Sequence, residues 1–241
     1  MTHLKEAVEG NDMFEVITTA DVEPNDLVWD VTWAMAVRDQ KLKARLCARD
    51  FANTRRDDLF SPGSTRLTER LIDFKAVKSG YTTFSLDVKA AYNSLKEPEQ
   101  VVVKPPVEWF AGEQVDKSIR WRMKGLLPGR RIAANIWVDH VAQVLQNCGF
   151  DRDAAFPHLF RRAADDVCVE IHMDDLHGCG PDAAVEALVK LLGTKLELKR
   201  ATTAKQGSGQ SYEHLKRTRV MLPGGVWLQA AGNMSRRSWN S

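Results

Sequence analysis

The chain has 241 residues, of which 44% are hydrophobic and 27% charged, and 34 basic against 32 acidic side chains leave a net charge of +2. This composition is typical of a globular protein with one sizeable core, and so mild a charge does not by itself indicate a polyanionic partner. Four scattered cysteines, no apolar run of membrane-spanning length and no signal-peptide pattern argue against a disulfide-rich, secreted or membrane protein. We therefore expect an intracellular protein, cytoplasmic or nuclear.

The first 80 residues contain a weakly patterned segment followed by the patterns of a strand and a helix. Residues 1–28 are acidic and weakly patterned, which predicts a poorly ordered lead-in. Residues 41–51 alternate basic and apolar side chains, as a strand with a charged exposed face does. A break at Ser61–Thr65 follows, and then a helical pattern runs to Gly80. The predicted core face of this helix is Leu67, Leu71, Phe74 and Val77.

The centre of the chain contains two alternating segments. In residues 81–92 the apolar face is Phe84, Leu86 and Val88, and Asp87 lies on the opposite face. Residues 105–118 suggest a loop, and a helical pattern then continues through Leu145 and stops at Gly149. In the second alternating segment, VCVEIHMDD, the predicted buried residues are Val167, Val169, Ile171 and Met173, with Asp174 on the polar face.

The C-terminal part predicts one more helix and one hairpin. The helix starts near Asp182, and its core face is Val185, Leu188, Val189, Leu192 and Leu196. Residues 206–211 suggest a flexible joint, residues 219–229 two short strands around a Pro-Gly-Gly turn, and residues 230–241 an irregular tail. This order predicts an α+β fold in which an antiparallel sheet carries helices on one face.

Three carboxylates are expected to meet in this fold. Asp87 and Asp174 share the polar face of the sheet, and the glycines of LHGCG predict a tight turn that places Asp174 and Asp175 at a hairpin tip. Converging carboxylates repel one another unless a cation neutralises them, and oxygen ligands suit Mg²⁺ or Mn²⁺. Two such ions would support in-line phosphoryl transfer to a 3′-hydroxyl. The alternative is that the Asp-Asp pair only solvates a turn.

Four segments in fixed order resemble the reverse transcriptase domain of copia-type retrotransposons: KARLCARDF, FSLDVKAAYNSLKEPEQVVVKPP, GLLPGRRIAANIW and IHMDDLHGCG. The resemblance extends from about Lys41 to Gln229. It implies an RNA-directed DNA polymerase with the palm and fingers of a right hand, its thumb largely missing, over residues 29–229. The implied partners are an RNA or DNA template-primer and dNTPs, with the remainder of a Pol polyprotein (ribonuclease H, integrase) or a second subunit.

The same resemblance implies roles for individual residues. Asp87, Asp174 and Asp175 would be catalytic and, with the Val88 backbone, would hold Mg²⁺ or Mn²⁺. Lys199 is a candidate for protonating pyrophosphate. The implied nucleotide-binding residues are Lys43, Arg45, Val88, Tyr92, Gly129 and Arg130, and the implied primer-grip residues are Tyr212, Leu215 and Lys216.

The chain also departs from the family pattern. His172 replaces the aromatic residue that most relatives carry two positions before the paired aspartates, and the segment around Gly129 lacks the family's glutamine. Because the sequence stops soon after the grip-like hairpin, we expect a fragment or a decayed copy. A catalytically inactive remnant that at most binds nucleic acid is the alternative function. A structural zinc site formed by Cys168, His172, His177 and Cys179 is an alternative for this region.

Overall fold

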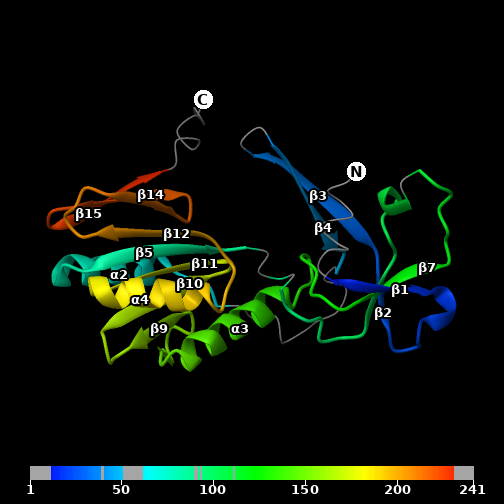
Figure 1. The fold of residues 1–241 in the computed structure, drawn as a ribbon, viewed down its shortest axis with the longest axis horizontal. Helices are drawn as coiled ribbons and strands as arrows, with labels where there is room; N and C mark the ends of the chain where they lie inside the picture. Colours follow the sequence, from blue (N-terminus) through cyan, green and yellow to red (C-terminus); the bar gives the residue numbers. More distant parts are fainter. Residues whose placement is uncertain are drawn as a thin grey trace, which may run out of the picture. The chain divides into compact units, whose positions relative to one another are not determined.

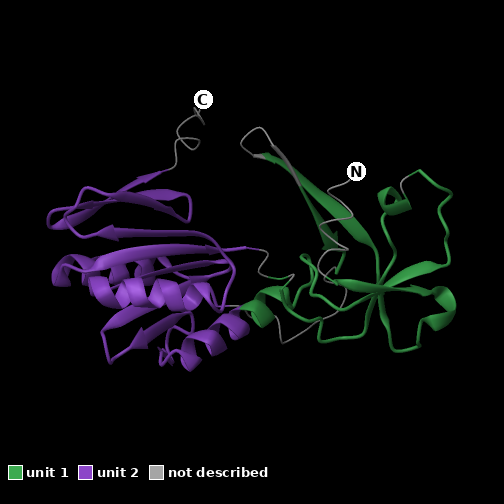
Figure 2. Ribbon diagram, in the orientation of Figure 1, with its two compact units in different colours: residues 1–60, 90–137 green, residues 61–89, 138–241 purple. Residues whose placement is uncertain are grey.

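The computed structural model describes residues 12–38, 41–50, 62–89, 92, 94–110 and 112–230. The chain divides into unit 1, residues 1–60 with 90–137, and unit 2, residues 61–89 with 138–241 (Figure 2). The division falls within helix α3, Ala133–Asn147. Among the described residues, no helix combines the length and the apolar character needed to cross a bilayer.

Unit 1 contains a four-stranded sheet in the order β1-β7-β6-β2 and a separate antiparallel hairpin, β3-β4 (Figure 1). Strands β2 and β6 are parallel, and the other neighbours are antiparallel. The bounds are β1 Phe14–Thr18, β2 Leu27–Trp29, β3 Val31–Arg38, β4 Lys41–Ala48, β6 Val101–Val103 and β7 Ile119–Met123, with 3-10 helices Thr19–Asp21 and Val107–Phe110. The strand predicted at 41–51 is therefore confirmed as β4. Part of the predicted lead-in is a paired strand, β1, while residues 1–11 lie outside the described residues.

A buried guanidinium group connects several segments of unit 1. The Arg130 side chain is inaccessible to solvent and lies over the Trp29 ring, 4.0 Å from its centroid. It forms ion pairs with Asp50 at 2.9 Å, with Glu97 at 2.9 Å and with Glu99. These carboxylates come from the segment after β4 and the segment before β6, so one side chain joins distant parts of the sequence. A buried cation in such a network is costly to remove, because its partners then stay buried and uncompensated.

Replacing Arg130 with methionine should therefore destabilise unit 1 by about 3–5 kcal/mol. Lys104→Met is the matched control, since Lys104 forms an ion pair with Asp30 in which both side chains are about half exposed. Exposed pairs contribute about 0–1 kcal/mol. Chemical denaturation of the wild type and both variants measures the two changes, and equal effects would contradict the structural role of Arg130.

Unit 2 is built on a six-stranded antiparallel sheet in the order β12-β5-β11-β10-β9-β8. A second sheet of three antiparallel strands, β13-β14-β15, belongs to the same unit. The bounds are β5 Thr82–Val88, β8 Asp151–Arg152, β9 Leu159–Arg162, β10 Val167–His172, β11 Asp175–Gly180, β12 Leu198–Lys205, β13 Ser211–His214, β14 Arg217–Leu222 and β15 Gly225–Ala230, with helices α2 Arg66–Ser79 and α4 Asp182–Gly193.

Helix α2 ends where the sequence predicts, but the face that it buries is the opposite of the predicted one. Gly80 ends it in the left-handed conformation, with φ of 68°. The predicted core residues Leu67, Leu71 and Phe74 are exposed, whereas Ile72 and Ala76 are buried together with Thr68, Glu69 and Asp73. The reason is that α2 packs on the polar face of the central sheet, where its buried polar side chains find partners.

Helices cover both faces of the central sheet, which corrects the prediction of helices on one face. On one face, Ile72 and Ala76 of α2 pack in a cluster with Cys179 and Tyr212. On the other, Asp182 at the start of α4 accepts a 2.7 Å hydrogen bond from Thr82, whose side chain shares a face with Phe84 and Leu86. The polar face of β10 and β11 is consequently buried over most of its length.

The hairpin between β13 and β14 turns through two residues with positive φ, Leu215 at 48° and Lys216 at 59°. Two-residue turns of this kind normally use asparagine and glycine, because a side chain with a Cβ disfavours positive φ. The turn therefore carries backbone strain that the pairing of β13 with β14 maintains.

Replacing Leu215-Lys216 with Asn-Gly should raise the free energy of unfolding by roughly 1–2 kcal/mol, because both residues tolerate positive φ. Thermal and chemical unfolding provide the measurement. Lys216→Arg is the control and should change stability by less than about 0.5 kcal/mol, since it keeps the strained backbone. An unchanged stability of the Asn-Gly variant would show that the turn is not strained.

Candidate active site

Two neighbouring strands bring the predicted carboxylates together in unit 2. Asp87, near the end of β5, is the direct cross-strand partner of Asp175, the first residue of β11. Asp174 immediately precedes it in the turn between β10 and β11, and its carbonyl accepts a 3.0 Å hydrogen bond from the Val88 amide. The structure therefore places the four residues predicted as metal ligands side by side at one end of the central sheet.

The turn that presents these carboxylates differs from the predicted one. It consists of Met173, with φ of 52°, and Asp174, whereas the glycines of LHGCG lie inside β11. Gly178 serves packing instead, because a Cβ at this position would lie 2.2 Å from the Cys168 carbonyl oxygen and 2.5 Å from the Phe84 ring. Met173, predicted to be buried, is about half exposed because it belongs to the turn.

Basic side chains border the carboxylates on β12. The Lys199 ammonium group lies 2.6 Å from Oδ2 of Asp87, and Arg200 is the cross-strand neighbour of Asp87. A register shift between Leu198 and Arg200 accommodates Lys199 as an extra residue. Lys199 is thus a strand residue that lies at the site.

The electrostatics of the site show that its carboxylates are crowded. Burial, and then the negative charges of Asp174 and Asp87, raise the pKa of Asp175 to about 6, against opposing effects of Arg200 and Lys199. The site therefore has more negative charge than its own basic residues compensate. Such an arrangement can accept a divalent cation.

His172 connects the site to the segment before α2. It is the cross-strand partner of Asp175, and its Nδ1 lies 3.0 Å from the Ser64 hydroxyl. The four side chains of the alternative zinc site do not gather in the described part of the chain. His177 instead contacts Glu170 and Tyr212, at 2.9 and 2.8 Å.

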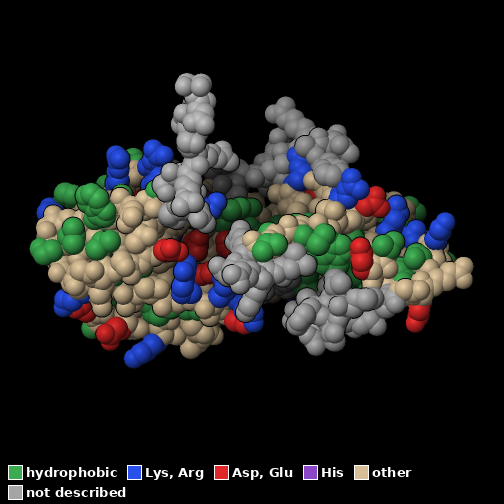
Figure 3. Space-filling view, turned by 90° about the horizontal axis from the view of Figure 1, so that it is seen from above, with side chains coloured by type: hydrophobic (Ala, Val, Ile, Leu, Met, Phe, Trp, Pro, Cys, Tyr) green, Lys and Arg blue, Asp and Glu red, His purple; other side chains and the backbone are tan. Residues whose placement is uncertain are grey.

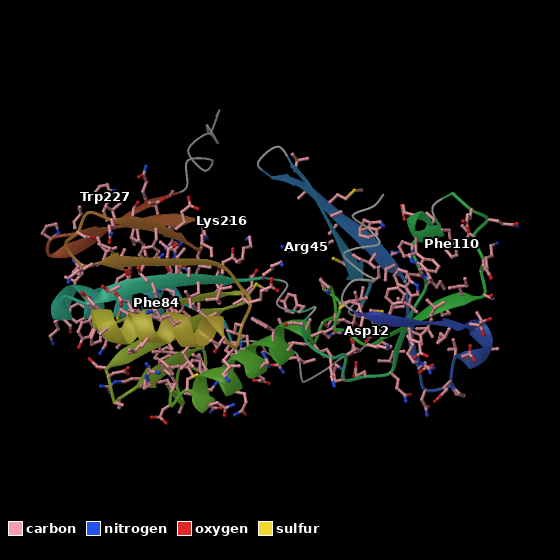
Figure 4. All side chains as sticks on the ribbon, in the orientation of Figure 1. Asp12, Arg45, Phe84, Phe110, Lys216 and Trp227 are labelled. Atoms are coloured by element: carbon pink, nitrogen blue, oxygen red, sulfur yellow. The ribbon has the colours of Figure 1, made fainter. Side chains whose placement is uncertain are left out.

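The remaining nucleotide-binding candidates belong to unit 1. Arg45 is exposed on β4 (Figure 4), and the Lys43 backbone pairs with β3, while its side chain lies outside the described part of the chain. Tyr92 is half-buried. Gly129 has φ of 87° and approaches β4 so closely that a Cβ would lie 2.5 Å from a backbone oxygen. Arg130 is enclosed by carboxylates, so its guanidinium group has a structural role.

The predicted primer-grip residues lie on and beside the β13–β14 turn. Leu215 and Lys216 form the turn, and Lys216 is exposed near the end of the hairpin (Figure 4). Tyr212 points inward and is only 4% exposed, and its hydroxyl forms a 2.8 Å hydrogen bond with Nε2 of His177. Tyr212 therefore anchors the hairpin to the central sheet.

Sequence reasoning missed a group of buried polar residues behind the carboxylates. Glu170, His214 and Arg219 are each at most 3% exposed. They lie on three different strands, and α2 adds Glu69 and Asp73. The sequence offers one weak signal for these residues: each strand has a polar residue at an alternating position. The signal is weak because a strand with a solvent-exposed face has the same pattern.

The comparisons with known proteins agree with this geometry. The family model for "Reverse transcriptase (RNA-dependent DNA polymerase)" matches residues 11–212, and it is the family of Ty1/copia-type enzymes. A search of curated proteins found no match. The fold is similar to that of apo telomerase from Candida tropicalis, with a TM-score of 0.55, 9% identity, and coverage of 93% of this chain and 59% of that one. The fold is also similar to that of telomerase from Candida albicans, solved with a fragment of telomeric RNA. That match has a TM-score of 0.53 and 9% identity, and it covers 95% of this chain and 49% of that one.

The chain therefore spans about half to three-fifths of the length of these structural relatives, and at 9% identity they show the fold alone. The family match covers most of the sequence, including both strands that carry the carboxylates. By that match, the chain belongs to the reverse transcriptase family of the Ty1/copia type.

Proposed function

We propose that this chain is the RNA-directed DNA polymerase domain of a copia-type retrotransposon Pol polyprotein. It would transfer a nucleotide from a dNTP to a primer 3′-hydroxyl, with unit 2 as the palm and unit 1 as the fingers of a right hand. The observation that carries the proposal is the direct pairing of Asp87 with Asp175, next to Asp174 in the adjoining turn.

The residues at the site fit a pair of divalent cations. Asp87, Asp174 and Asp175 supply carboxylate oxygens, and the Val88 carbonyl is a further oxygen on the same strand end. Burial and then the neighbouring charges of Asp174 and Asp87 raise the pKa of Asp175, and a bound cation would relieve both effects. Bound Mg²⁺ or Mn²⁺ would lower the pKa of the attacking hydroxyl and neutralise the charge of the leaving pyrophosphate.

The chain's own residues would position the substrates and move a proton. Lys199, held against Asp87, is an ammonium donor at the edge of the site and a candidate for protonating the leaving pyrophosphate. By family resemblance, Lys43 and Arg45 would contact the triphosphate, Gly129 would line the nucleotide site, and Tyr92 would lie beneath the sugar. An RNA or DNA template-primer is the expected partner, gripped by the Leu215-Lys216 turn and supported from inside by Tyr212.

A second candidate function is an inactive remnant that only binds nucleic acid. The observation that favours it is His172, which replaces the usual aromatic residue and is tied to Ser64 at 3.0 Å. Arg45 and Lys216, both exposed, could still attract phosphates. Such binding would require no carboxylate.

Primer extension on an RNA template distinguishes the two functions. With dNTPs and Mg²⁺ we expect the wild type to extend the primer and Asp174→Asn to lose roughly 100-fold or more of the rate, since a carboxylate that holds the metal is removed. Asp151→Asn, which changes an exposed acid on β8, is the matched control and should retain activity.

Fluorescence anisotropy with the same template-primer completes this test. A folded wild type that binds the duplex but extends no primer with either Mg²⁺ or Mn²⁺ would support the remnant. Equal activities of Asp174→Asn and the wild type would place catalysis elsewhere. In both functions, the affinity should fall as the salt concentration rises.

The crowding of the carboxylates predicts a pH-dependent stability. The folded-state pKa of Asp175, about 6, is above its ordinary value of 3.8, so its contribution to stability is greatest below about pH 4 and is lost as the pH rises through 6. Without divalent ions, Asp175→Asn should therefore raise the unfolding temperature at pH 7.5 and have little effect at pH 4. Mg²⁺ should stabilise the wild type at pH 7.5 more than the variant. A variant that is less stable than the wild type at pH 7.5 would contradict this account.

A further inference from the structure

A second cluster of titratable side chains lies deeper in unit 2, beginning two positions along the β10–β11 ladder from the His172–Asp175 pair. Glu170 on β10, His177 on β11 and His214 on β13 have side chains that are inaccessible to solvent. One donor atom from each lies within 4.8 Å of the others. The His177 and His214 rings are stacked, with centroids 4.5 Å apart. Nothing in the proposed polymerase chemistry uses these residues.

Several donor atoms in this cluster lack hydrogen-bond partners. Both ring nitrogens of His214 and Oε2 of Glu170 are buried without one. His214 Nε2 lies 4.0 Å from Glu170 Oε1, which is too long for a hydrogen bond. A neutral imidazole always carries one N–H donor and one acceptor, and leaving both unsatisfied in a protein interior is costly. These unpartnered atoms are therefore available to bind a ligand.

Acidic side chains outnumber buried basic ones around the cluster. Glu69, Asp73 and Glu170 are three carboxylates, while Arg219 is the one fully buried cation among them. Arg217 contacts Glu69 at 3.6 Å but is partly exposed. A divalent cation would balance this excess.

The donors match the chemistry of a transition metal. Two imidazoles and a carboxylate are an established ligand set for Zn²⁺, and the free Oε2 gives Glu170 the means to supply a fourth donor. Tyr212 lies 2.8 Å from Nε2 of His177, so it can fix the tautomer that leaves Nδ1 free to coordinate.

From this juxtaposition we propose that Glu170, His177 and His214 form a buried structural site for a divalent transition metal, with Zn²⁺ as the best fit. The site joins β10 and β11 of the central sheet to β13 of the three-stranded sheet. It would fix the β13–β14 hairpin, and with it the turn at Leu215 and Lys216, against the sheet that carries Asp174 and Asp175. The proposal is independent of whether the chain polymerises DNA.

The test measures metal content and stability of the full chain. Protein unfolded with chelator and refolded with Zn²⁺ should retain one equivalent after desalting, and its unfolding temperature should rise. Refolding with Co²⁺ should give the visible absorption of a four-coordinate ion. In His214→Leu and His214→Gln, the affinity for Zn²⁺ should fall by more than about 100-fold, because loss of a ligand exceeds the 10–100-fold effect of changing its outer contacts.

Two controls separate this site from the rest of the protein. His140→Gln removes a histidine of α3 outside the cluster, and Asp174→Asn removes a carboxylate of the candidate active site; both should keep the bound Zn²⁺. The proposal is overturned if the folded wild type retains no Zn²⁺, if both His214 variants bind it as tightly as the wild type, or if Asp174→Asn abolishes binding. Failure of primer extension would leave these results unchanged, so the two proposals fail separately. Variants are compared only after circular dichroism shows a native fold, and the leucine variant, which removes the orphaned nitrogens, is expected to fold.

Discussion

Strand β5 is the element on which unit 2 depends, because both of its edges are paired and both of its faces are covered. It lies between β11 and β12, and six of its seven residues are buried. The exception is Asp87, which stays partly accessible at the end of the strand. Full pairing leaves the backbone no freedom to shift register, so the position of Asp87 opposite Asp175 is fixed by the hydrogen bonds of the sheet. The candidate site is therefore held by a rigid element rather than by loops.

Covering both faces of this sheet has a consequence for its polar side chains. The buried residues that alternate with the apolar core, among them Glu170 and His177, cannot reach water, so they must find partners inside the protein. Helix α2 supplies Glu69 and Asp73, and β14 supplies Arg219, which lies 2.6 Å from Glu69. Atoms of Glu170 and His214, the residues of the inferred metal site, remain without hydrogen-bond partners, as do Asp73 Oδ1 and Arg219 Nε, which form an ion pair at 3.4 Å. A buried polar layer of this kind is costly unless every member has a hydrogen-bond partner. The atoms without a partner therefore point to a place where a ligand could bind.

The surface of unit 2 is unusual for the same reason. Because α2 turns its polar side chains inward, Leu67, Leu71 and Phe74 are exposed, and Trp227 on β15 is 61% exposed as well. Hydrophobic side chains are accordingly visible on the surface of this unit (Figure 3). In unit 1 the buried Arg130 lies over the Trp29 ring, which packs against that unit's hydrophobic core. In each unit, a buried arginine pairs with acidic residues that are distant from it in the sequence.

The sequence by itself determined several elements and singled out the candidate carboxylates. Alternation located β5 and β10, Gly80 located the end of α2, and the ordered motifs proposed Asp87, Asp174 and Asp175 as the site. Only the tertiary structure decided which face of α2 is buried, because a helix with apolar residues on one side and Thr68, Glu69 and Asp73 on the other follows its partner's chemistry and not its own pattern. It also decided that the turn is Met173-Asp174, since Gly178 is required where Phe84 packs against β11. Only the contact between two sheets brings His214 to Glu170 and His177. Glu170 and His214 are 44 positions apart along the chain, and no local periodicity of the sequence predicts such a contact.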